Sequence, residues 1–162
     1  AVQALLAGKV DGYLGDEVAL KAVIAEQPDI GYIPEYLTYN EYNFAFRKND
    51  PAGDALREEL NAWLSQSWAD GTMQEIDSIW FGTDEARKTV DLPGTAGENG
   101  TIRVVTTSTD MPFSYIKDGK NVGYDIDIVA RFCRDRGYES FFGKKCAICK
   151  FSRKCGIFEI IS

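Results

Sequence analysis

The sequence predicts an α/β protein made of partial layers of helix and strand. Helix-forming and β-branched segments alternate along the first 82 residues, and the alternation resumes with a β-branched strand near residue 102. Of the 162 residues, 44% are apolar and 12% are aromatic, which is typical of a globular chain rather than a disordered one.

The first segment predicts a helix, a strand and a helix in quick succession. Residues 1–7 are good helix formers, and residues 10–14 form a short run closed by a Gly-Asp pair, which predicts a strand. Residues 17–26 return to helix-forming composition before a proline. Residues 42–46, in a tyrosine-rich stretch, predict an extended segment.

Two amphipathic helices are expected next. Asp50 and Pro51 form a cap followed by a first-turn proline. Apolar residues then recur at helical spacing at Leu56, Leu60, Trp63 and Leu64 and, after a break at residues 70–71, at Met73, Ile76, Ile79 and Trp80. We interpret the tryptophans on these stripes as core residues rather than as a stacking platform.

The next segments predict a linker, a hairpin and a helix. Residues 83–100 contain Pro93 and several glycines without apolar periodicity, which indicates a surface linker. Residues 102–105 predict a strand, and apolar runs on both sides of the turn at 117–120 predict a hairpin. Asp125 is expected to cap the following helix, which has an apolar face formed by Ile128, Val129, Phe132 and Cys133.

Charge and composition exclude several classes of function. Eighteen Lys and Arg against 25 Asp and Glu give a net charge of −7, which argues against nucleic acid or an anionic membrane surface as a partner. The absence of histidine excludes Ser-His-Asp and Cys-His catalysis and His-liganded zinc. No run approaches the roughly 18 apolar residues of a membrane span, and any export signal is expected upstream.

The last segment, residues 139–162, differs in composition from the rest. It carries five basic residues against two acidic ones, a net charge of +3, and three of the four cysteines. It has no sustained apolar face, so we expect it to lie outside the fold and to add little stability. Cys146, Cys149 and Cys155 leave a structural zinc one ligand short unless Cys133 joins them, so no metal site is expected.

Two stretches carry a family resemblance. The first comprises AVQALLAGKVDGYLGDEVAL, YNFAFRKNDP and WADGTMQEIDSIWFG, and the second is TIRVVTTSTDMPFSYIKDGKNVGYDIDIVARFCRDRGY. Both resemble bacterial extracellular solute-binding proteins of family 3, the type 2 periplasmic proteins that bind polar amino acids. The resemblance implies two α/β lobes that close on a ligand held in the cleft between them.

The resemblance also implies a domain organisation. Residues 1–82 look like the C-terminal part of a first solute-binding domain, and residues 83–100 look like a linker. Residues 101–138 look like the N-terminal part of a second domain, and residues 139–162 form an atypical tail. Because residues 50–82 and 101–138 both resemble first-lobe pieces, we expect them to pack together as a permuted partial lobe. The middle segments of both copies, which hold the ligand carboxylate in this family, are not in this chain.

Asp16 is the first candidate ligand-binding residue. It lies where a strand is expected to end and a helix to begin, which is where open α/β layers bind ligands. A carboxylate there can accept a charge-assisted hydrogen bond from an α-ammonium group, worth about 1.5–3 kcal/mol. The resemblance implies this amine-binding role, and the alternative is a helix cap.

The other candidates lie in the loop after the strand at residues 102–105. The resemblance implies that this loop lines the cleft, with an acidic residue and an aromatic at the positions of Thr107 and Asp110. Neither is the usual residue type, and Asp110 favours a cationic ligand over an apolar one. Phe113 is either a cleft residue or a core aromatic. Asp125 and Asp127 are interpreted as scaffold residues at a helix start, because no nucleophile or base accompanies them.

The expected function is extracellular binding of a polar amino acid or a similar solute for ABC-type uptake, with a membrane permease as partner and without a cofactor. One alternative is the ligand-binding region of a membrane signalling protein. A second is a dehydratase-like enzyme on the same fold, which the lack of an acid–base pair disfavours. The expected location is periplasmic or extracellular, with or without a membrane anchor.

Overall fold

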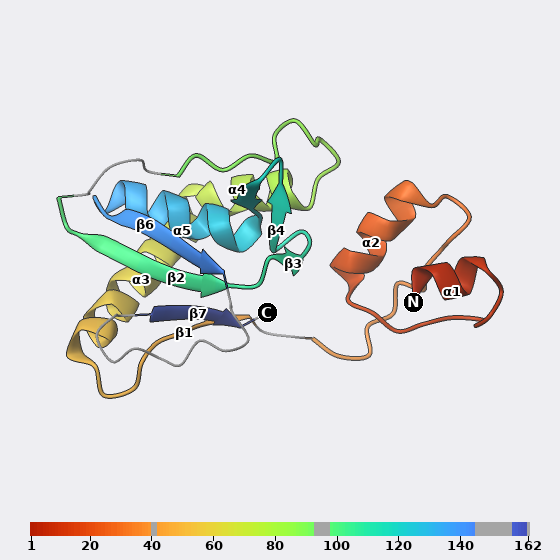
Figure 1. Cartoon of the computed structure of the whole chain (residues 1–162), viewed down its shortest axis with the longest axis horizontal. Helices are drawn as coiled ribbons and strands as arrows, with labels where there is room; N and C mark the ends of the chain where they lie inside the picture. Colours follow the sequence, from red (N-terminus) through yellow and green to blue (C-terminus); the bar gives the residue numbers. More distant parts are fainter. Residues whose placement is uncertain (40–41, 93–97, 145–156, 162) are drawn as a thin grey trace. The chain divides into compact units, whose positions relative to one another are not determined.

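The computed structural model describes residues 1–39, 42–92, 98–144 and 157–161, and the chain divides into two units, Ala1–Asn40 and Glu41–Ser162 (Figure 1). The predicted α/β class is confirmed, because helices and a partly parallel sheet share the second unit.

The first unit contains two helices, α1 (Val2–Leu6) and α2 (Glu17–Glu26), both of which the sequence predicted. The Glu17 carboxylate accepts hydrogen bonds from Tyr36 at 3.0 Å and Tyr32 at 3.3 Å, which tie the segment after α2 back to its first turn. The strand predicted at residues 10–14 is wrong. No strand lies in residues 1–39, and an extended segment without a neighbour cannot form a hydrogen-bonded ladder.

The second unit contains a four-stranded sheet in the order β1-β7-β2-β6. Its strands are β1 (Asn43–Ala45), β2 (Thr101–Thr106), β6 (Glu139–Lys144) and β7 (Ile157–Ile161). β2 is parallel to both β6 and β7, and β1 is antiparallel to β7. On β2, Ile102, Val104 and Thr106 are buried while Thr101 and Arg103 are exposed, so one face of this strand points into the core.

The sheet corrects the expectation for residues 139–162. β6 follows the last helix and pairs with β2 over six residues, and β7 lies between β1 and β2. The sequence-based argument failed because strand pairing is made by backbone groups and does not require a sustained amphipathic face. Cys146, Cys149 and Cys155 lie outside the described residues.

Helices α3 (Pro51–Asp70) and α4 (Thr72–Trp80) supply one side of the core, and both follow the predicted apolar stripes. The Asp50 side chain caps α3 by accepting a 3.3 Å hydrogen bond from the Ala52 amide. Gly71, at φ 91°, separates the helices in a left-handed conformation that suits glycine. Leu60, Trp63, Met73, Ile76, Ile79 and Trp80 are buried.

The hairpin and last helix form as predicted, with one correction. β3 (Thr109–Asp110), β4 (Ser114–Lys117) and β5 (Lys120–Val122) make a small antiparallel sheet, and α5 (Tyr124–Asp135) follows. The expectation that Asp125 caps α5 is wrong. The N-cap is Gly123, at φ 139°, and a Cβ there would collide with the carbonyl oxygen of Phe113. The chain therefore enters α5 too close to Phe113 for a capping side chain at that position.

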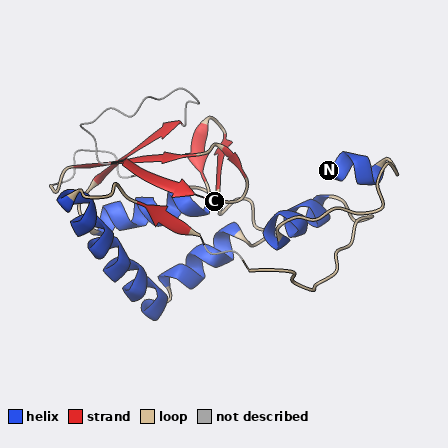
Figure 2. Ribbon diagram, turned by 90° about the horizontal axis from the view of Figure 1, so that it is seen from below, coloured by secondary structure: helices blue, strands red, loops and turns tan. Residues whose placement is uncertain are grey.

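A shared hydrophobic core joins α3 and α4 to β2 and α5. It contains Trp63, Ile76 and Trp80 from α3 and α4 together with Val104 of β2 and Phe132 of α5. Figure 2 shows the helices of this unit gathered on one side of its strands. The expected packing of residues 50–82 against residues 101–138 is therefore confirmed. Burial of each large side chain stabilises the unit by about 1.5–3 kcal/mol.

Candidate solute-binding loop

The loop after β2 brings Thr107, Asp110 and Phe113 together at the carboxyl end of the strand. Asp110 pairs with Ser114 across β3 and β4, and the Ser114 hydroxyl donates a 2.6 Å hydrogen bond to the Thr107 carbonyl. Ser114 is buried, so this bond fixes the start of the loop against its end. The carboxyl ends of strands are where open α/β sheets bind ligands.

Phe113 lies in an aromatic cluster that the sequence did not reveal. Its ring centroid lies 5.2 Å from that of Tyr42, 6.0 Å from Phe81 and 6.3 Å from Tyr124. Phe113 is only 9% exposed, which fits the core interpretation of this residue, whereas Tyr42 and Phe81 are 46% and 43% exposed. The outer members of the cluster therefore present aromatic surface, and Phe113 supports them from beneath.

Asp125 is buried directly behind the loop. It is 8% exposed, and its amide donates a 3.0 Å hydrogen bond to the Phe113 carbonyl, while the Tyr124 amide donates one to Pro112. Burial, together with the negative charge of Asp110, raises the pKa of the Asp125 carboxyl to about 7. A positive charge placed near both carboxyls would relieve this repulsion.

Asp127, the neighbouring acid on α5, has a different environment. Its carboxylate accepts a 3.0 Å hydrogen bond from the Trp80 indole and a 3.1 Å bond from Arg131, which in turn contacts Glu75 at 2.8 Å. These bonds support the interpretation of Asp127 as a scaffold residue. Among the described residues, the two acids therefore differ in their partners, since Asp127 accepts hydrogen bonds from an indole and a guanidinium group.

Asp16 belongs to the first unit, where it is exposed and occupies the N-cap position of α2. Its backbone is extended there, with φ −66° and ψ 139°, but its side chain makes no capping hydrogen bond. Asp16 therefore takes the N-cap position that the helix-cap alternative expected, without the side-chain hydrogen bond of a cap. Its amine-binding role stays a prediction.

Two observations on the described residues concern metal ligands and thiols. That part of the chain contains no group of three or more His, Cys, Asp or Glu side chains placed to hold a metal ion. Cys133 is a free, buried thiol whose pKa is raised to about 12 by burial, which keeps it protonated and unreactive at neutral pH. No helix among the described residues is long and apolar enough to cross a membrane.

Comparison with known proteins gives an informative similarity. Over 79 residues, 46% of this chain, the sequence is 34% identical to the ABC transporter arginine-binding protein 1 of Escherichia coli strain K12. The chain covers 31% of the length of that protein. No family model matches the chain, and no solved structure matches it significantly.

Proposed function

We propose that this chain contributes to an extracellular solute-binding protein that binds a polar amino acid for ABC-type uptake. The observation that carries the proposal is the loop after β2, in which the charge of Asp110 acts on the buried Asp125 and Phe113 packs against the exposed Tyr42 and Phe81. The similarity to an arginine-binding transport protein supports the same conclusion. Its partners would be the amino acid and a membrane permease, and its location periplasmic or extracellular.

The loop has the chemistry to bind a cationic group. A ligand ammonium or guanidinium group would contact Asp110 and Thr107, with the aromatic faces of Tyr42 and Phe81 favouring a positive charge beside them. Bound there, the cation would favour the ionised form of Asp125 and lower its pKa. We therefore expect binding to strengthen as the pH rises from about 6 to 8.

Asp16 has a separate role in the proposal, which concerns the two-lobed parent protein. The family resemblance implies that it accepts a hydrogen bond from the α-ammonium group of the ligand, opposite a carboxylate-binding arginine. Replacing Asp16 by alanine in that protein would leave the ammonium unpaired. We expect a loss of roughly a hundredfold or more in affinity.

Titration calorimetry tests the proposal in two proteins. The chain alone, with an incomplete site, should bind L-arginine, L-lysine and L-glutamine no more tightly than about 1 mM, whereas the parent should bind one of them at micromolar concentration. Asp110→Asn in the parent should weaken binding at least tenfold. Asp118→Asn is the matched control, since it removes one negative charge from the exposed hairpin turn after β4. Equal affinities of the two variants would exclude Asp110 from the site.

A further inference from the structure

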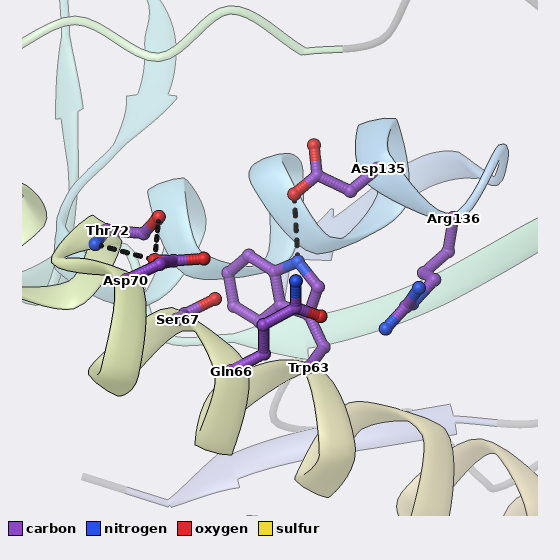
Figure 3. A pocket seen from close by; sticks show the side chains of 7 residues that line it. All are labelled: Trp63, Gln66, Ser67, Asp70, Thr72, Asp135 and Arg136. Carbon is purple, nitrogen blue, oxygen red and sulfur yellow. Dashed lines mark hydrogen bonds between the residues drawn. The ribbon is translucent and has the colours of Figure 1, made fainter.

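A polar cavity that contains none of the loop residues lies between the C-terminal half of α3 and the end of α5. Its volume is about 330 Å³, at the lower end of the range for small-molecule pockets. Figure 3 shows the residues that line it: Trp63, Gln66, Ser67, Asp70, Thr72, Asp135 and Arg136. A cavity of this size accommodates a single amino acid rather than a nucleotide.

The charges around this cavity favour a ligand with a net positive charge. Asp70 and Asp135 are carboxylates, and of the seven lining residues only Arg136 is cationic. The Thr72 hydroxyl and amide donate to Asp70 at 2.7 and 3.0 Å, and these bonds lower the pKa of Asp70, so it is ionised at neutral pH. α3 and α5 end beside the cavity, where their C-terminal carbonyl groups add partial negative charge, whereas α4 begins there at Thr72 and adds partial positive charge, so the carboxylates decide the sign.

One carboxylate of the cavity is held in place by a hydrogen bond, and one buried donor has no hydrogen-bond partner among the described residues. The Trp63 indole donates a 2.8 Å hydrogen bond to one oxygen of Asp135, which orients that carboxylate, as Figure 3 shows. Ser67, which also lines the cavity, is 3% exposed. The buried Nε of Arg136 has no hydrogen-bond acceptor, since the nearest carboxylate, that of Glu59, lies 3.8 Å away. Unsatisfied buried donors of this kind point to an absent acceptor.

We infer that this cavity is a binding site for a basic α-amino acid. The ligand carboxylate would accept a hydrogen bond from Arg136 Nε, and its two cationic groups would contact Asp70 and Asp135. The Ser67 hydroxyl would bond to either kind of group. A basic amino acid carries two positive charges and one negative charge at neutral pH, which complements the two carboxylates and one guanidinium group that line the cavity. Asp135 also lies 3.9 Å from Arg134, and Arg136 lies 3.8 Å from Glu59, so the ligand would compete with these two long ion pairs.

Nuclear magnetic resonance of the ¹⁵N-labelled chain tests this inference. Titration with L-lysine to concentrations above about 1 mM should shift the indole N–H resonance of Trp63 in a saturable manner, because that group bonds to Asp135. The resonance of Trp80, which bonds to Asp127 in the core, should not move. L-norleucine lacks the side-chain cation and cadaverine lacks the carboxylate, so each should bind roughly tenfold or more weakly than L-lysine. Equal binding of all three ligands would overturn the inference.

Three variants separate this cavity from the loop after β2. Asp135→Asn keeps an acceptor for the Trp63 indole and should still fold, and Ser67→Ala is a small change. Both should weaken L-lysine binding, by roughly tenfold for Asp135→Asn. Asp110→Asn should leave the shift of Trp63 unchanged. Either of two outcomes would overturn the inference. One is that L-lysine no longer shifts the Trp63 resonance in Asp110→Asn, and the other is that Asp135→Asn binds L-lysine as tightly as the parent chain. Failure of the loop to bind amino acids would leave the titration at Trp63 unaffected.

Discussion

The Trp80 indole donates a 3.0 Å hydrogen bond to the Asp127 carboxylate, and both residues are buried. Trp80 ends α4, before the linker, and Asp127 lies in the first turn of α5, 47 residues later in the chain. The bond therefore joins the two sequence segments that each resemble part of a solute-binding lobe. Burying the Asp127 carboxylate without a hydrogen-bond partner would cost free energy, and the indole donor offsets that cost.

Trp80→Phe tests this junction. The variant loses the hydrogen bond to Asp127 and leaves unfilled space beside Tyr115, whose ring packs edge-on against Trp80. We expect the free energy of unfolding to fall by about 2–4 kcal/mol in urea denaturation. Trp68→Phe is the control, because Trp68 is 51% exposed and its replacement should cost no more than about 0.5 kcal/mol. Similar losses of unfolding free energy in the two variants would contradict a stabilising role for the bond between Trp80 and Asp127.

Asp125→Asn should change stability in a pH-dependent way. The folded state binds the Asp125 proton more tightly than the unfolded state, whose pKa is about 3.9, so stability falls as the pH rises from about 4 to about 7. The amide cannot ionise. We therefore expect the variant to be more stable than the parent chain by a few kcal/mol at pH 8 and equal to it near pH 4.

Thermal unfolding at several pH values measures this difference for Asp125→Asn. Asp118→Asn removes an exposed carboxyl in the hairpin turn and should follow the parent chain throughout. A constant difference between Asp125→Asn and the parent chain, from pH 4 to pH 8, would show that Asp125 titrates normally.

Gly123→Ala should disrupt the entry to α5. Its φ of 139° is strained for any residue with a side chain, and the added Cβ would meet the carbonyl of Phe113. Because backbone on both sides is held by hydrogen bonds, we expect a loss of more than about 2 kcal/mol. At Gly12, by contrast, an added Cβ would have no atom within 4 Å. Gly12→Ala should therefore change stability by less than about 1 kcal/mol in the same assay.

Deleting residues 139–162 distinguishes the sheet from the sequence-based expectation. The deletion removes β6 and β7, which are the two neighbours of β2, so Ile102 and Val104 would lie on an unpaired strand. We expect the free energy of unfolding to fall well beyond the roughly 1 kcal/mol typical of surface changes. A truncated chain with unchanged thermal unfolding would instead support the expectation that this segment lies outside the fold.

The helices of this protein were predictable because their hydrogen bonds and apolar contacts are local. The stripe from Met73 to Trp80 is buried as predicted, and the Asp50-Pro51 pair begins α3 as predicted. A helix closes its hydrogen bonds within four residues, so spacing in the sequence is sufficient to place it. The hairpin at residues 117–120 was predictable for the same reason, since its turn residues set the local backbone.

The strands and the candidate sites depended on tertiary structure. Residues 10–14 had strand-like sequence but no partner, whereas β6 and β7 formed because β2 supplied backbone groups to pair with. Three features depend on residues that are far apart in the chain. They are the burial of Asp125, the aromatic cluster around Phe113 and the cavity beside Trp63. The sequence by itself determined which segments are helical and which side chains are candidates for contact with a charged solute. Only packing decided which of those side chains lose water, because burial depends on neighbours that no local pattern encodes.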